Sequence, residues 1–194
     1  VQGCHMRCQY CHNPDTWSDK KNQVMTSDEL LQKALRYKSY WGKDGGITVS
    51  GGEPLLQIDF LIEFFKKCKK GEFFEKFKEL MKYTDLLLLD IKEINSQRHK
   101  LLTGVQNENI LDMARYLSEI HKPIWIRHVL VPTRSDFDED LHALRAFIDT
   151  LSNVEKVEVL PYHTLAIHKY EDMGIDYPLK GIDSPSEERV KNAR

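Results

Sequence analysis

Short β-branched and apolar runs alternate along this chain with longer segments of helical period, and no other feature limits the possible folds as strongly. The runs that predict strands are residues 46–50, 86–91, 124–131 and 154–160. The residues before Cys4 are expected to form the tail of a further strand. Repeated βα units fold into largely parallel sheets covered by helices, so we expect an α/β protein.

Two helices are predicted in the first half of the chain. The capping box that begins at Thr26 opens a helix extending to about Tyr40. A second helix carries apolar residues at helical spacing, namely Ile58, Leu61, Ile62, Phe65 and Cys68. Cys68 lies on this stripe, so we expect it to be buried as a small hydrophobic residue. The lysines around it, at 66, 67, 69 and 70, are expected to form a solvated helix face, with contact to an acidic electron donor as the alternative.

Further helices are expected at about residues 108–120 and 138–151. Near the end of the chain, Ser184-Pro185-Ser186-Glu187 predicts a capping box with proline at the first helical position.

The alternation breaks once, near residue 70. The helix ending there is followed by Gly71 and by another amphipathic segment at 73–81, with no strand between them. Counting a strand at this point, β and α alternate about six times, whereas eight units typically occupy about 250 residues. We therefore expect an open, partial (βα)6 barrel in one domain spanning residues 1–194. Residues of the natural chain are expected to be missing at both ends and near 70–71.

The charge balance excludes some partners. Lys and Arg number 28 and Asp and Glu 30, a net charge of −2 that makes no electrostatic case for nucleic acid. No apolar run approaches the ~18 residues of a membrane span, so we expect no membrane partner. Three of the four cysteines fall between positions 4 and 11, which indicates a metal site and a reducing compartment, the cytoplasm.

The three clustered thiols carry the chemistry of a metal centre. Cys4, Cys8 and Cys11 lie within eight residues, so their sulfurs can converge on one site. Thiolates are soft ligands that suit zinc or iron–sulfur clusters. Three protein ligands suit a cluster with one open iron, whereas structural zinc needs a fourth ligand, for which His5 and His12 are the candidates. A zinc-binding adaptor is therefore the alternative from outside enzymology.

A glycine-rich motif, Gly51-Gly52-Glu53-Pro54, ends the predicted strand 46–50. Glycines at the carboxyl end of a strand let a ligand approach the backbone, and an acidic residue beside them can take the ammonium group of an amino-acid moiety. Alone, the motif would equally suit a turn with a solvated glutamate. It is expected at the same end of the sheet as the cysteine loop, which favours a binding role.

Polar residues also follow the later strands. The sequence places Asp90-Ile91-Lys92 at the end of one strand, Arg127 and His128 inside the next, and His163 after the last. The carboxyl ends of barrel strands form active sites, and charges inside a buried strand need partners. Each residue alone suits an ion pair equally well, but their shared location favours function.

The cysteine loop, with Tyr10 before its last cysteine, and the Gly-Gly-Glu-Pro motif together resemble the radical S-adenosylmethionine (SAM) superfamily. The resemblance implies that the three cysteines hold a [4Fe–4S] cluster and that SAM binds the fourth iron. It also implies that Glu53 meets the amino group of SAM beside Gly52. The other residues implied to line the SAM site are Tyr10, His12, Asp90, Ile91, Lys92, His163 and, as a further candidate, Arg127.

Within the superfamily, three further stretches resemble the activating enzymes of glycyl-radical enzymes, of the type that acts on pyruvate formate-lyase: Leu89-Asp90-Ile91-Lys92, Trp125-Ile126-Arg127 and Leu160-Pro161-Tyr162-His163. This resemblance implies hydrogen abstraction from a glycine of pyruvate formate-lyase, a flavodoxin or ferredoxin as electron donor, and a monomer. Many activating enzymes carry extra cysteines for further clusters, and none occurs between Cys11 and Cys68. Activation of another glycyl-radical enzyme, or a small-molecule radical reaction, is the alternative.

Overall fold

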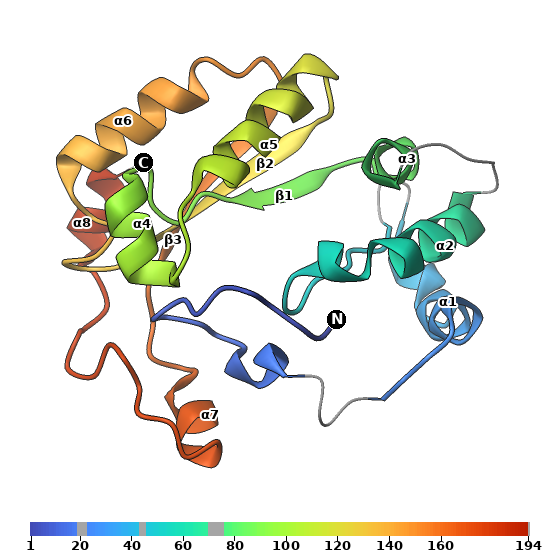
Figure 1. Cartoon of the computed structure of the whole chain (residues 1–194), viewed down its shortest axis with the longest axis horizontal. Helices are drawn as coiled ribbons and strands as arrows, with labels where there is room; N and C mark the ends of the chain where they lie inside the picture. The colour runs from blue at the N-terminus through green and yellow to red at the C-terminus, as the bar shows by residue number, and fades with distance from the viewer. Residues whose placement is uncertain (19–22, 43–45, 70–75, 194) are drawn as a thin grey trace. The chain divides into compact units, whose positions relative to one another are not determined.

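The computed structural model describes residues 1–18, 23–42, 46–69 and 76–193 (Figure 1). Contacts between Cα atoms divide the chain into two compact units. The first comprises Val1–His5 and Asp15–Asp85, and the second comprises Met6–Pro14 and Leu86–Arg194. The expectation of a single domain stays a prediction.

The first unit is helical in its described part. Its core lies where α2 packs against α1 and α3, with Leu61 and Phe64 almost fully buried on the apolar stripe of α2. Its elements are α1 (Ser27–Leu35), η2 (Lys38–Tyr40), η3 (Pro54–Gln57), α2 (Ile58–Lys69) and α3 (Lys76–Tyr83). The 3₁₀ turn η1 (Pro14–Trp17) lies where the chain passes from the second unit to the first.

The capping box at Thr26 is confirmed. The Thr26 side chain accepts a hydrogen bond from the backbone N of Glu29, and the Glu29 carboxylate accepts one from the backbone N of Thr26. The regular helix ends at Leu35 instead of Tyr40, and a 3₁₀ turn follows at Lys38–Tyr40.

The expected strand at 46–50 is wrong, as is the strand tail before Cys4. Both segments lack regular strand structure, yet they pair with each other in the parallel sense. Val1 N donates to Ser50 O at 2.6 Å, Gly52 N to Val1 O at 2.9 Å, and Glu53 N to Gly3 O at 2.7 Å. This pairing begins where the expected strand ends, and Gly51, at φ 131°, departs from strand geometry within it.

The expectation that Cys68 is buried is also wrong, because the structure leaves it exposed near the end of α2. The lysines before it are paired with acidic side chains of the same unit. Lys66 forms an ion pair with Glu79, and Lys67 lies 2.7 Å from Asp28 and 2.9 Å from Glu63. This pairing weakens the case for an acidic donor at this face. The break in alternation at 70–71 falls outside the described residues.

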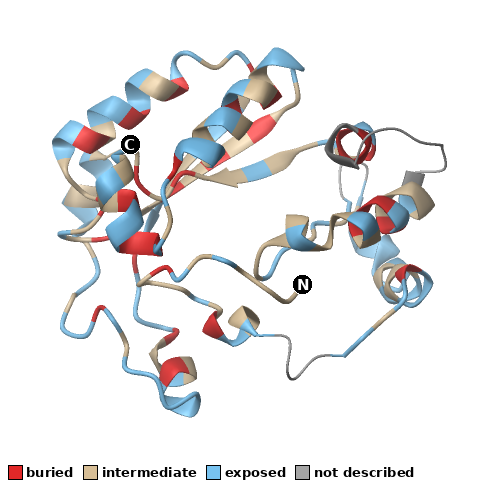
Figure 2. Cartoon of the chain, in the orientation of Figure 1, coloured by how far each residue is buried: buried red, intermediate tan, exposed pale blue. Residues whose placement is uncertain are grey.

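The second unit contains a parallel three-stranded sheet in the order β1-β2-β3, formed by β1 (Leu87–Asp90), β2 (Ile124–Leu130) and β3 (Val154–Pro161). Three predicted strands are thereby confirmed within a residue or two at each end, and the α/β class with an open parallel sheet is confirmed with them. Alternate residues of β2 are fully buried, so the strand presents two distinct faces (Figure 2). In register, Asp90 lies opposite Arg127.

Five helices accompany this sheet: α4 (Ser96–Thr103), α5 (Glu108–Glu119), α6 (Asp138–Ile148), α7 (Ile167–Asp172) and α8 (Glu187–Asn192). The predictions for α5 and α6 are confirmed, while α4 and α7 were not predicted. The cap of α8 is Ser186 and not Ser184, because the Ser186 hydroxyl accepts from Arg189 N at 3.1 Å.

Across the described ranges, no helix is long and apolar enough to cross a membrane.

Candidate functional site

The backbone of the cysteine loop is held by the end of a helix. Arg7 N donates to Thr103 O at 2.7 Å, and Gln9 N donates to Leu102 O at 2.9 Å. The last carbonyls of a helix have no partner inside it, so α4 offers acceptors at its C-terminus that the loop amides fill. The Gln9 side chain adds a third bond, from Nε2 to Leu101 O at 3.1 Å.

Helix α4 is well defined at both ends, although its apolar pattern is weak. Asn95 Oδ1 accepts from Gln97 N and Arg98 N, each at 3.1 Å, and Gly104 ends the helix at φ 86°. An asparagine cap and a terminal glycine nine residues apart are the signal by which the sequence could have revealed this helix.

Helix α7 holds the other side of the loop. The hydroxyl of the fully buried Tyr170 donates to Cys11 O at 3.1 Å, and Lys169 Nζ donates to Asn13 Oδ1 at 2.9 Å. His12 and His163 lie edge to face with their ring centroids 5.0 Å apart. The structure thus brings together two residues, His12 and His163, that the sequence assigns to one SAM site.

The thiols fit a soft metal centre in their chemistry. None of the three cysteines forms a disulfide in the described part of the chain, Cys8 is buried, and Cys4 and Cys11 are half-buried. Cys11 N donates to Cys8 O at 3.0 Å, which forms a turn between these two. Cys4 belongs to the first unit and the other two to the second, and no group of three metal-binding side chains is found among the described residues. The assignment of the three thiols to iron stays a prediction.

The predicted residues at the strand ends form a charged cluster in the second unit. Arg127 Nε donates to Asp90 Oδ1 at 2.7 Å, and Lys92 Nζ donates to Asp90 Oδ2 at 3.0 Å. Burial of the Asp90 carboxyl opposes its ionisation, but these two cations outweigh burial and hold the pKa of Asp90 below its usual value. The cluster therefore carries a net positive charge, which suits an anionic group such as a carboxylate.

Tyr10 joins this cluster from the cysteine loop. Lys92 Nζ lies 5.7 Å from the centroid of the Tyr10 ring, a cation–π contact. Burial of the Tyr10 hydroxyl, which has no hydrogen-bond partner in the described part of the chain, raises its pKa. Burial opposes the charge on Lys92, yet Tyr10 and Asp90 beside it hold the pKa of Lys92 above its usual value. Lys92 is thus a permanent cation beside the cysteine loop.

The glycine-rich motif is described within the first unit. A Cβ atom at residue 52 would lie 2.1 Å from Gly3 O, so only glycine permits the backbone to pass this close to the residue before Cys4. Glu53 Oε1 accepts from Leu55 N at 3.0 Å and so caps η3. The role of Glu53 toward an amino group stays a prediction.

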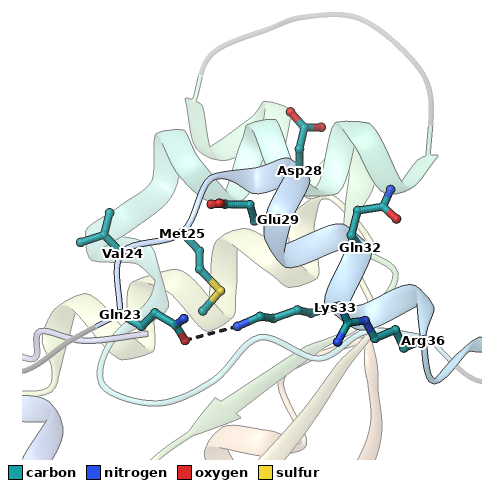
Figure 3. Close-up of a pocket in the computed structure, with 8 residues that line it drawn as sticks. All are labelled: Gln23, Val24, Met25, Asp28, Glu29, Gln32, Lys33 and Arg36. Carbon is teal, nitrogen blue, oxygen red and sulfur yellow. Dashed lines mark hydrogen bonds between the residues drawn. The ribbon is translucent and has the colours of Figure 1, made fainter.

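A pocket on α1 contains none of the predicted site residues (Figure 3). Lys33 Nζ donates to Gln23 Oε1 across it at 3.2 Å, and Met25 points into it. Its lining is mostly exposed, so we do not assign it to the site.

The sequence model of the radical SAM superfamily matches residues 1–148 of the chain. The chain belongs to the radical SAM superfamily. Enzymes of this superfamily use a [4Fe–4S] cluster and SAM, which are the cofactors expected from the cysteine loop.

Relatives within the superfamily are similar over almost the whole chain. The pyruvate formate-lyase-activating enzyme of Streptococcus mutans is 51% identical over 100% of this chain and 81% of the relative. The enzyme of the same name from Listeria monocytogenes is 50% identical over 98% of this chain and 84% of the relative. That from Staphylococcus epidermidis is 48% identical over 100% of this chain and 84% of the relative.

Solved structures agree on the radical SAM fold. A domain of pyruvate-formate lyase-activating enzyme from Bacteroides vulgatus superposes with a TM-score of 0.61 at 28% identity, over 76% of this chain and 89% of that one. SuiB of Streptococcus suis, bound to S-adenosylmethionine, superposes with a TM-score of 0.62 at 17% identity, over 83% of this chain and 39% of that one. This likeness shows the fold alone.

Proposed function

We propose that this radical SAM enzyme activates pyruvate formate-lyase by generating its glycyl radical. The observation that carries the proposal is the identity of about 50% to several enzymes of that name, which extends over nearly the whole chain. Membership of the superfamily alone would support many radical reactions, whereas similarity at this level supports one substrate.

When bound, a reduced [4Fe–4S] cluster and SAM would supply the one-electron chemistry by which a hydrogen atom is removed from a glycine of the partner. The tasks of this chain are binding and orientation. Cys4, Cys8 and Cys11 would hold three irons as thiolates, and the fourth iron would be left to SAM.

The charged cluster would orient SAM through its amino-acid end. Lys92 and Arg127 face the Asp90 carboxylate from two sides, and the excess positive charge suits the SAM carboxylate. Tyr10 and the edge-to-face pair of His12 and His163 would line the same site. Gly52, Glu53 and Ile91 complete the proposed set, with Glu53 toward the SAM amino group.

Three further properties belong to this proposal. The electron donor is a reduced flavodoxin or ferredoxin, because the reaction needs one electron at low potential. The enzyme acts in the cytoplasm, where thiolate ligands remain reduced. It acts as a monomer on a protein substrate.

The test begins with anaerobic reconstitution of the full-length enzyme and analysis of iron and sulfide. Four irons and four sulfides per chain are expected, and zinc without sulfide would instead indicate the adaptor. The enzyme is then mixed with SAM, dithionite and pyruvate formate-lyase, and a glycyl-radical signal is expected by electron paramagnetic resonance. SAM cleavage without that signal, together with a signal on another glycyl-radical enzyme, would replace the substrate assignment.

A further inference from the structure

His128 is buried on the face of β2 opposite the charged cluster, and its ring lies between two backbone carbonyls. It is 3% exposed. Nδ1 lies 2.9 Å from Ile91 O, and Nε2 lies 2.9 Å from Ser135 O. A carbonyl oxygen can only accept, so a ring nitrogen forms a hydrogen bond here only when it carries a hydrogen; a neutral imidazole carries one such hydrogen and the imidazolium two.

The Ser135 end of this bridge is firmly fixed. Ser135 is fully buried, its hydroxyl donates to Val129 O at 2.7 Å, and that hydroxyl accepts from Val131 N at 3.1 Å. Ser135 N also donates to Val131 O at 3.0 Å. The loop after β2 is therefore a rigid anchor for one side of the imidazole ring.

The Ile91 end lies directly after β1, between two of the proposed SAM residues. Ile91 N donates to Arg127 O at 3.0 Å, which extends the backbone pairing of β1 and β2 by one residue. Asp90 and Lys92 flank Ile91 in sequence. Neighbouring residues of β2 point to opposite faces of the sheet. Arg127 therefore contacts the Asp90 carboxylate from one face, and His128 contacts the carbonyl of Ile91 from the other.

We infer that His128 is a positioning residue for SAM binding, which acts by fastening the segment Asp90–Lys92 to the Ser135 anchor through Nδ1–H and Ile91 O. This inference rests on the proposed role of Asp90 and Lys92 toward SAM.

Three substitutions separate the two ends of the bridge. His128→Phe keeps a ring and removes both ring nitrogens. His128→Asn keeps a donor at the position of Nδ1, and His128→Gln keeps one near the position of Nε2. His142→Phe is the matched control, since His142 is exposed on α6.

The first measurement needs neither the iron–sulfur cluster nor SAM. Hydrogen exchange of the apo protein is followed by mass spectrometry in peptides covering residues 90–95, with α5 peptides as the internal reference. Faster exchange is expected at 90–95 in His128→Phe and His128→Gln, and wild-type exchange in His128→Asn and His142→Phe.

The second measurement is SAM cleavage by the reconstituted enzymes with dithionite. The segment Asp90–Lys92 is proposed to bind SAM equally in the ground state and the transition state. KM for SAM should therefore rise about tenfold in His128→Phe and His128→Gln, with kcat little changed. His128→Asn should restore KM. If His128→Phe fails to fold, the Asn and Gln pair decides alone.

Equal effects of the Asn and Gln substitutions would overturn the inference, because they would trace the effect to ring packing. Wild-type exchange and KM in His128→Phe would overturn it as well. Absence of SAM cleavage by the wild-type enzyme would instead contradict the proposed function, and the exchange measurement would still decide whether His128 fastens the segment Asp90–Lys92.

Discussion

At the scale of single residues, Asp90 is the shared anion of the charged cluster in the proposed SAM site. One carboxylate serves two cations, Lys92 and Arg127, and all three side chains are at least two-thirds buried. Removing one member of such a group leaves the others as poorly solvated charges, which costs more than the lost contact itself.

We expect Asp90→Asn to lower the unfolding free energy by about 1–2 kcal/mol, because Lys92 and Arg127 lose their counter-charge. Urea denaturation measures this change. The control is Asp149→Asn, which removes an exposed ion pair with Arg145 on the surface of α6 and should cost less than about 0.5 kcal/mol. Equal losses in the two variants would contradict a special role for Asp90.

Glu93 carries a buried carboxyl group directly after the segment Asp90–Lys92. Its side chain is almost fully buried, Oε1 accepts from Asn95 N at 2.9 Å, and Oε2 has no hydrogen-bond partner among the described residues. Burial raises the pKa of Glu93 to about 7 from 4.5, with nearby Asp140 adding to the shift. The folded protein therefore binds this proton more tightly than the unfolded chain does.

The sign of the pH effect follows from this difference. Between pH 4.5 and about 7 the unfolded chain loses the Glu93 proton first, so the unfolding free energy falls as pH rises. We expect Glu93→Gln to be more stable than wild type at pH 8, by up to about 3 kcal/mol, and nearly equal to it at pH 4. Denaturation across this range measures the difference. The exposed control Glu119→Gln should show the same pH dependence of the unfolding free energy as wild type. The same pH dependence in Glu93→Gln would refute the raised pKa of Glu93.

At the scale of elements, α4 links the proposed SAM site to the cysteine loop. Its N-cap, Asn95, lies three residues after the segment Asp90–Lys92, and its last carbonyls accept from Arg7 N and Gln9 N. Gln9 also accepts from Arg134 Nε at 3.2 Å, which ties the same loop to the segment after β2. The loop conformation thus depends on helices and not on the loop sequence alone.

We expect Asn95→Ala to cost about 1 kcal/mol, because two backbone N–H groups lose their cap. Fraying of α4 should also speed hydrogen exchange at Arg7 and Gln9. Ser186→Ala is the control, since it removes the cap of α8 in the same unit at similar cost. If Ser186→Ala accelerates exchange in the cysteine loop equally, the link through α4 is wrong.

At the scale of the whole molecule, a metal centre held by thiolates ties folding to cofactor binding. A group that binds the native state and not the unfolded chain raises stability by mass action. Three of the four cysteines are proposed ligands, whereas Cys68 is exposed near the end of α2. The cysteines therefore offer both the test and its control.

We expect reconstitution with iron and sulfide to raise the melting temperature by at least about 3 °C, as a gain of 1 kcal/mol or more implies for a chain of this size. The Ala variants of Cys4, Cys8 and Cys11 should neither retain a full cluster nor show this rise, and they should lose activity. Cys68→Ala should behave as wild type in iron content, melting temperature and activity. A loss of iron in Cys68→Ala would overturn its exclusion from the site.

The amino-acid sequence by itself determined the features that depend on local order. The spacing of Cys4, Cys8 and Cys11, the capping box at Thr26 and the apolar runs of β1, β2 and β3 are patterns within a few residues. Periodicity and capping act at this range, so these predictions needed no fold. The apolar runs also placed Asp90 at the end of one strand and Arg127 inside the next, and the register of the sheet brings the two opposite each other.

Only the tertiary structure decided which distant groups hold these features in place. The Gln9 side chain contacts the carbonyl of Leu101, which is 92 positions away in sequence, and the His128 ring contacts the carbonyl of Ile91, which is 37 positions away. The exposure of Cys68 and the burial of Glu93 were likewise decided by packing. The physical reason is that a hydrogen bond to a carbonyl, or the removal of a side chain from water, depends on what the fold brings beside it, and no pattern of neighbouring residues records that.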